Sequence, residues 1–186
     1  MKRLVFALAA AAAMGASAEM KFGTVDVMLL VRNHPSYESN KAFLTTTDKD
    51  YQKKLDAIKA EGDKLQEEGK GLVEQMNNPM LTVKAKAEIE TKLRDLQKKL
   101  LSIDQNYRSE ALHCRQELQA TEARLLKTTT DDLRKRITAY AEANGYDVVL
   151  DRNATAYAKP GMDITDAMLK EMGVDPAEAK GKDEGK

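Results

Sequence analysis

The residues of this chain that could perform chemistry are few, and their spacing forms no catalytic or metal-binding pattern. The sequence contains one cysteine, Cys114, and two histidines, His34 and His113. His113 and Cys114 are neighbours in a segment with a helical pattern, so their side chains diverge by about 100° and would chelate one metal poorly. We therefore expect no enzyme activity, no cofactor and no metal. We assign Cys114 to a helix-packing position and His34 to a turn at the junction between a small body and a helical hairpin.

The composition restricts the possible partners. The 186 residues include 30 basic and 30 acidic residues, three phenylalanines, six tyrosines and no tryptophan. A highly charged chain with few aromatic side chains is typical of long solvated helices rather than of a large compact core. The balanced charge argues against binding to nucleic acid, which depends on a basic excess that displaces counterions from phosphate.

Residues 1–18 have the pattern of a cleaved secretory signal peptide. Lys2 and Arg3 precede an uncharged, mostly apolar run, and Ala16-Ser17-Ala18 supplies the small residues of a cleavage site. The apolar run is too short to span a bilayer. We expect export and cleavage after Ala18. Removing Lys2 and Arg3 from 30 basic and 30 acidic residues leaves 28 and 30, a net charge of −2.

Two long helices are predicted in the middle of the chain. Residues 36–76 carry apolar side chains at spacings of three, four or seven, which is a heptad seam. Asn77-Asn78-Pro79 ends this helix, because proline disfavours helical geometry before it and asparagine tolerates the left-handed conformation that closes a helix. Thr82 caps a second helix that runs to about residue 144, followed by Gly145 as its C-terminal cap. The two helices must form a protruding antiparallel hairpin.

The seam of the first helix is weak at three positions, Asp48, Gly62 and Gly69, which recur every seven or fourteen residues in one register. A glycine inside a helix costs about 1 kcal/mol relative to alanine. The second helix has no such interruption between residues 89 and 107. We predict that Gly62 and Gly69 are hinge points of a flexible arm. The alternative is that small residues let the two helices approach closely.

The flanking segments predict a small β body. Residues 22–27, 146–151 and 154–158 read as three short strands, the last two joined by a tight turn. Asp163 caps a short helix over residues 164–172, and the polar residues that follow are expected to be disordered. A sheet this small is marginal alone, so we expect it to assemble with other copies. The proposed assembly residues are Phe22, Val25, Val27, Val148, Leu150 and Tyr157.

These segments divide the chain into five parts. They are the signal peptide (1–18), a first body part (19–35), the hairpin arm (36–144, with its turn near 77–82), a second body part (145–174) and a tail (175–186).

The distal end of the arm has a small basic excess. Between residues 70 and 99 there are four acidic and seven basic residues, namely Lys70, Lys84, Lys86, Lys92, Arg94, Lys98 and Lys99. One interpretation is an ordinary solvated helix surface. The other is a basic arm tip that makes transient contact with an anionic membrane surface or an acidic client.

Several short motifs resemble the OmpH/Skp family of periplasmic chaperones. The motif Phe22-Gly23-Thr24-Val25-Asp26 is followed by His34-Pro35, and the strand at residues 146–151 is followed by Ala156-Tyr157 and Asp163-Ile164-Thr165. The resemblance covers nearly the whole mature chain. It implies an α+β fold, with a small β body and a coiled-coil-like helical arm, that assembles as a jellyfish-like homotrimer in the periplasm.

The resemblance also implies a function. Family members hold unfolded outer-membrane proteins between their arms without ATP, so we expect a holdase chaperone. The best-known members are strongly basic, whereas this mature chain is near neutral, so strong electrostatic capture of clients is not expected. The alternative function is a trimeric coiled-coil structural or adaptor protein of the cell envelope that binds a folded partner. The interrupted seam of the first helix favours the chaperone, because a rigid spacer would gain from leucine at Gly62 and Gly69.

Overall fold

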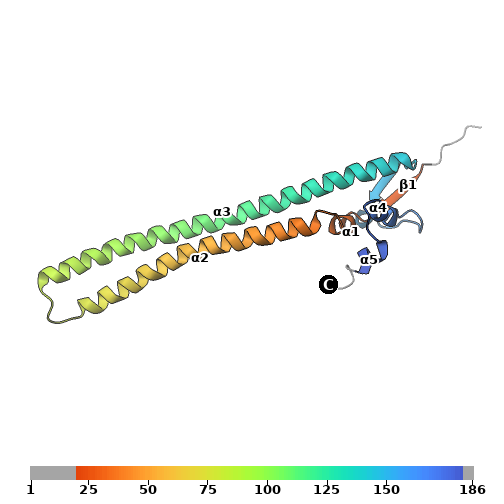
Figure 1. Cartoon of the computed structure of the whole chain (residues 1–186). Helices are drawn as coiled ribbons and strands as arrows, with labels where there is room; N and C mark the ends of the chain where they lie inside the picture. The colour runs from red at the N-terminus through yellow and green to blue at the C-terminus, as the bar shows by residue number, and fades with distance from the viewer. Residues whose placement is uncertain (1–19, 182–186) are drawn as a thin grey trace, which may run out of the picture.

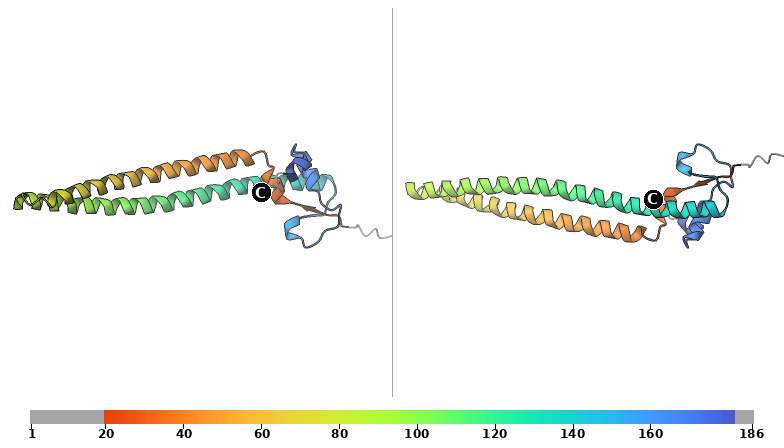
Figure 2. Two further views of the ribbon diagram at one scale, coloured as in Figure 1. Left: turned by 90° about the horizontal axis from the view of Figure 1, so that it is seen from below. Right: turned by 90° about the horizontal axis from the view of Figure 1, so that it is seen from above.

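A long helical hairpin projects from one end of a small body (Figures 1 and 2). This computed structural model describes residues 20–181, so the expected signal peptide, its cleavage site and the last five residues of the expected tail lie outside it. Helices α2 (Tyr37–Met76) and α3 (Val83–Ala143) form the hairpin and run side by side in all three views. At about 1.5 Å per residue, α2 is about 60 Å long. The predicted helical hairpin is therefore confirmed.

The hairpin turns at the predicted residues but through a different backbone conformation. α2 ends at Asn77, whose φ of −75° is right-handed. No non-glycine residue in the described range has a positive φ, so the expected left-handed asparagine is wrong. The Asn78 carboxamide oxygen instead accepts a hydrogen bond of 3.0 Å from the N–H two residues later. Thr82 caps α3 as predicted, accepting from the Ala85 N–H at 3.2 Å.

Two strands from opposite ends of the chain pair in parallel. β1 (Phe22–Val25) lies beside β2 (Val148–Asp151), with Phe22 opposite Val148. This pairing confirms that the hairpin closes between the two body segments. A Cβ at Gly23 would lie 3.1 Å from the ring of Tyr146, so that ring would have to shift to accept a larger residue.

The third strand expected at residues 154–158 is not formed. A short 3₁₀ helix, η1 (Arg152–Ala154), follows β2 directly, because the Asp151 carboxylate accepts a hydrogen bond of 3.0 Å from an N–H inside that turn. The favoured two-residue hairpin turns would need positive φ there, which no arginine or asparagine between residues 20 and 181 adopts. The position beside β1 is taken instead by residues 162–164, which exchange two backbone hydrogen bonds of 2.8 Å with Thr24.

The core of the body is enclosed by α1 (Val27–Arg32), the last turns of α3, and α4 (Thr165–Glu171). Asp26 begins α1 by accepting a hydrogen bond of 2.9 Å from the Leu29 N–H. The largest fully buried side chains of the described residues all belong to this core, and they are Val25, Leu30, Leu133, Met168 and Leu169. The end of α3 is therefore part of the body as well as of the arm.

The C-terminal boundaries differ from the prediction in two ways. α4 is one residue shorter at each end than expected, although the Asp163 carboxylate does accept from the Thr165 N–H at 2.9 Å. Part of the expected disordered tail forms a helix, α5 (Pro176–Gly181). Ala179 is only 1% exposed in the body core, and Lys180 pairs with Asp166 at 2.7 Å. The segment is polar, so its sequence did not indicate that one alanine and one ion pair attach it to the body.

Candidate functional site

The two arm helices share a narrow interior. Four of its apolar side chains are buried, and most of the others are half-buried. The four are Leu72, Ile89, Leu96 and Cys114. Asp48, which we expected in the interior, is exposed, and Thr47 takes the inward position because a helix turns every 3.6 residues rather than every 3.5. The prediction that Asp48 weakens the seam was therefore wrong.

The two glycines of α2 have different surroundings. A Cβ at Gly62 would lie 3.4 Å from Ile103 Cγ2, whereas a Cβ at Gly69 would meet no atom within 4 Å. Close approach of the helices therefore does not explain Gly69. Beside Gly62 a groove of about 590 Å³ opens between the helices, and Leu101 and Tyr107 contribute to its lining. The hinge role of both glycines stays a prediction.

Cys114 lies in the interior of the arm, as the sequence predicted. Its thiol donates to Glu110 Oε1 at 3.7 Å, and the same oxygen accepts a hydrogen bond from Lys54 on α2. The hydrogen bond from Lys54 lowers the pKa of Glu110. Burial raises the pKa of the Cys114 thiol, and the negative charge of Glu110 raises it further. The site therefore disfavours the thiolate, which is the reactive form of cysteine.

His34 lies at the junction of the body and the arm, as the sequence predicted, and it also contacts the second arm helix. Its side chain is only 11% exposed, with Nε2 3.1 Å from Asp132 Oδ2 on α3 and Nδ1 2.8 Å from Ser36 Oγ. Asp132 also accepts a hydrogen bond of 2.8 Å from Arg136. The hydrogen bonds from Arg136 and then His34 hold the pKa of Asp132 below its usual range. Nothing in the local sequence around His34 indicates a partner 98 residues away.

The basic residues predicted at the arm tip are all exposed. Lys70 and Lys98 each lie within 3.5 Å of an acidic side chain one turn earlier, which partly neutralises them. The turn and the first residue of α3 present two apolar side chains that the sequence did not point to, Met80 at 88% and Val83 at 87% exposure. The tip is thus a mixed apolar and weakly basic surface, and its contact with a membrane stays a prediction.

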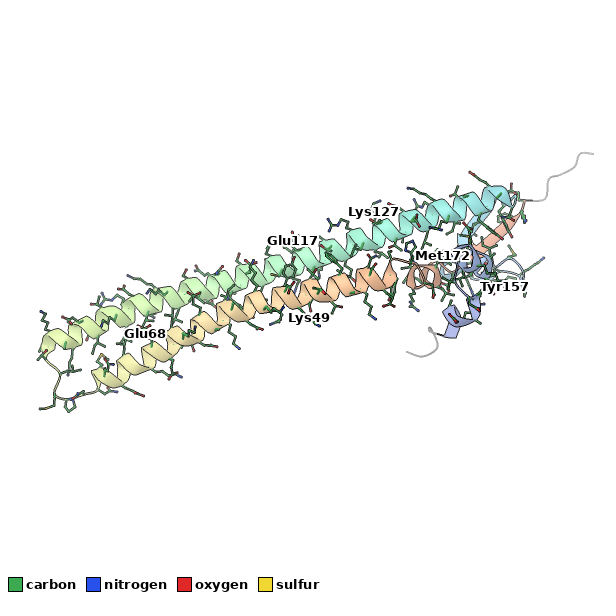
Figure 3. All side chains as sticks on the ribbon, viewed as in Figure 1. Lys49, Glu68, Glu117, Lys127, Tyr157 and Met172 are labelled. Carbon is green, nitrogen blue, oxygen red and sulfur yellow. The ribbon has the colours of Figure 1, made fainter. Side chains whose placement is uncertain are left out.

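The predicted assembly residues of the body fall into two groups. Val25 is 2% exposed in the core of its own chain, so this structure contradicts its use as an assembly residue. The residue belongs to the core that α1, α3 and α4 share, and the sequence alone could not show this packing. The other five are exposed or half-buried, and they are Phe22, Val27, Val148, Leu150 and Tyr157. Figure 3 shows Tyr157 on the loop at the far end of the body from the arm.

A second groove, of about 690 Å³, lies between the body end of α3 and strand β2. Among the described residues, no group of three or more histidine, cysteine or acidic side chains is arranged to hold a metal. None of the helices in the same range is both long and apolar enough to cross a membrane.

Known proteins share both the sequence features and the fold of this chain. The sequence matches the family described as outer membrane protein (OmpH-like) over residues 21–172. The fold is similar to the crystal structure of a candidate outer membrane chaperone (OmpH-like) from Caulobacter crescentus, with a TM-score of 0.66 and 20% sequence identity. The similar region covers 83% of this chain and 85% of that one. Comparison with curated proteins gives no significant match.

Proposed function

Because this chain belongs to the OmpH-like outer membrane protein family, we propose that it is an ATP-independent holdase chaperone of the periplasm. It binds outer-membrane proteins while they are unfolded and prevents their aggregation during transit to the outer membrane. It requires no cofactor and catalyses no reaction. The similarity to a protein named as a candidate outer membrane chaperone supports this proposal.

The observation that carries the proposal is an arm whose surface is far larger than its interior. α2 and α3 contain 40 and 61 residues, yet only a few side chains between them are buried. Several large apolar side chains remain on the arm surface instead, including Phe43, Leu101, Leu112 and Leu126. Such a surface offers many weak, non-directional contacts to an unfolded chain.

We propose that three copies assemble through the body, with the arms enclosing the client. In the described part of the chain the sheet has only two strands, so it gains from pairing with other copies. Phe22, Leu150 and Tyr157 are exposed apolar side chains at the body, and Val27 and Val148 line the groove beside β2. We propose these five as the trimerisation surface.

Export follows from residues 1–18, for which we propose cleavage after Ala18. In the periplasm the arm tips would make a transient contact with an anionic membrane surface through Met80, Val83 and the basic residues around them. We propose no binding to nucleic acid.

The function is tested by diluting an outer-membrane β-barrel from urea and following its aggregation by light scattering. The mature protein, added at a stoichiometric amount of trimer without ATP, is expected to suppress the scattering. Sedimentation of the protein alone is expected to give a trimer, and Tyr157→Glu with Leu150→Glu to dissociate it. Unchanged aggregation with intact trimers would remove the chaperone proposal and favour the structural adaptor.

A further inference from the structure

One side of α3 carries basic residues and no acidic ones, although the chain as a whole has equal numbers of each. Successive residues of a helix are about 100° apart, so the positions of residues 94–126 can be sorted by direction. A sector of about 80° contains three arginines, three leucines, three glutamines, one alanine and no acidic residue. We define the arginine–leucine face by six of them, namely Arg94, Leu101, Arg108, Leu112, Arg115 and Leu126.

The arginine–leucine face is accessible along its whole length. Leu101, Leu112 and Leu126 are 60%, 57% and 49% exposed, and the three arginines are exposed as well. Leu101 also lines the groove beside Gly62, so the face adjoins a hollow in the arm. Arg108 lies 3.0 Å from Asp104, which stands at the edge of the face, whereas Arg94 and Arg115 have no ion pair in the described part of the chain.

We propose that the arginine–leucine face binds acidic segments of unfolded outer-membrane β-barrels. This inference rests on the proposed holdase function and names the surface and the client chemistry that the function would use. Arginine recognises carboxylates and backbone carbonyls with a fork of N–H donors, and leucine supplies apolar contact. A chain with no net charge can therefore still attract an acidic client, because three of its positive charges lie on the same face as three exposed leucines.

A flexible client fits this face better than a second arm does. The leucines are 11 and 14 residues apart, or about 16 and 21 Å along the axis, which is too sparse for the continuous seam of a helix pair. Parallel arms related by rotational symmetry would also bring Arg108 and Arg115 of one copy level with the same residues of the next, a repulsive arrangement. An extended polypeptide covers the distance from Leu101 to Leu126 with about eleven residues.

The test compares three full-length mature variants with the wild type. The first replaces the charge of the face (Arg94→Gln, Arg108→Gln, Arg115→Gln), and the second replaces its apolar residues (Leu101→Gln, Leu112→Gln, Leu126→Gln). The matched control removes three exposed positive charges elsewhere on the arm (Lys49→Gln, Lys64→Gln, Arg124→Gln). Figure 3 marks Lys49 on α2. Binding is measured with an acidic outer-membrane β-barrel kept unfolded, and with the same barrel after its carboxylates are replaced by amides.

We expect the arginine variant to bind the acidic client about tenfold more weakly at low salt, since each exposed ion pair contributes a few tenths to 1 kcal/mol. The deficit shrinks at high salt and is absent for the amide client. The leucine variant binds both clients more weakly, and the control matches the wild type. A photo-crosslinker at Leu112 captures the client, whereas one at Glu117, on the far side of α3, does not.

Two results would overturn the inference while leaving the holdase function intact. In one, the wild type binds clients and the arginine variant behaves as the control does. In the other, the crosslinker at Leu112 joins two copies of the protein, and the leucine variant changes the oligomeric state. Failure of the wild type to bind either client would instead remove the proposed function itself.

Discussion

The body and the arm of this protein differ in how their side chains are buried. In the body, Leu30, Met168 and Leu169 are 0% exposed and belong to one continuous core built from α1, α3 and α4. In the arm, the most buried side chains retain 4–8% exposure, and three of them form a small separate cluster. The body therefore depends on one core shared by several elements, whereas the arm depends on contacts between two helices that repeat along its length. Local opening of the arm need not unfold the body.

The largest expected effect is a difference in stability. Truncating a core side chain of the body should lower the free energy of unfolding far more than truncating an apolar side chain on the arm surface. Met168→Ala removes a fully buried side chain and is expected to lower the free energy of unfolding by about 2–5 kcal/mol. Leu126→Ala, at a position that is 49% exposed, should change it by less than about 1 kcal/mol. Urea unfolding followed by circular dichroism measures both. Similar losses at the two positions would mean that the arm is packed as tightly as the body.

The second prediction tests whether the arm opens before the body unfolds. Cys114 is 4% exposed, and its raised pKa keeps the thiol protonated, so a thiol reagent should label the native protein slowly. In increasing urea, we expect labelling to accelerate before the amides of β1 and β2 lose their protection from hydrogen exchange. Coincident transitions would show one cooperative unit, and fast labelling without urea would contradict the interior position of Cys114.

The contrast between the two regions also explains what the sequence could predict. The arm was foreseen almost to the residue, because heptad spacing, the Asn77-Asn78-Pro79 break and the Thr82 cap are local signals. Asp48 was misplaced because a 3.5-residue repeat was extended over a helix that turns every 3.6 residues. An error of this kind grows with distance from the best-packed part of the seam.

The body was predicted less well because its structure depends on long-range contacts. The β1–β2 pair was foreseen from the apolar strands, but residues 162–164 rather than 154–158 occupy the position beside β1. Val25 is buried in the core that α1, α3 and α4 share, and His34 meets Asp132, through contacts that no local pattern records. The arginine–leucine face was not predicted for another reason, since heptad spacing identifies only the positions that face the partner helix.

A smaller effect is expected at the two glycines of the arm. Gly69→Ala should stabilise α2 by about 1 kcal/mol. The added methyl meets no atom within 4 Å, and alanine lowers the backbone entropy of the unfolded state. Gly62→Ala should gain less, because its methyl would lie 3.4 Å from Ile103 Cγ2. Thermal unfolding measures the gain, and hydrogen exchange over residues 55–76 locates it. The hinge prediction is wrong if that segment of the wild type is already as protected as residues 89–107.

The smallest effect is expected where the body and the arm meet. The pKa of Asp132 is held below its usual range by Arg136 and then His34. A carboxylate whose pKa is lower in the folded state stabilises that state above its unfolded pKa, and this contribution is lost as the pH falls through the folded pKa. Asp132→Asn should therefore reduce the melting temperature modestly at neutral pH, and the difference from the wild type should disappear in acid.

The neighbouring carboxylate supplies the control for that last experiment. The pKa of Asp131 is also lowered, by a hydrogen bond from Lys127 on the same helix, but Asp131 does not contact His34. Asp131→Asn should thus show the same direction of pH dependence without loosening the junction. Only Asp132→Asn should speed hydrogen exchange at residues 33–36, where α1 gives way to α2. If both variants leave that exchange unchanged, the contact between His34 and Asp132 does not couple the arm to the body.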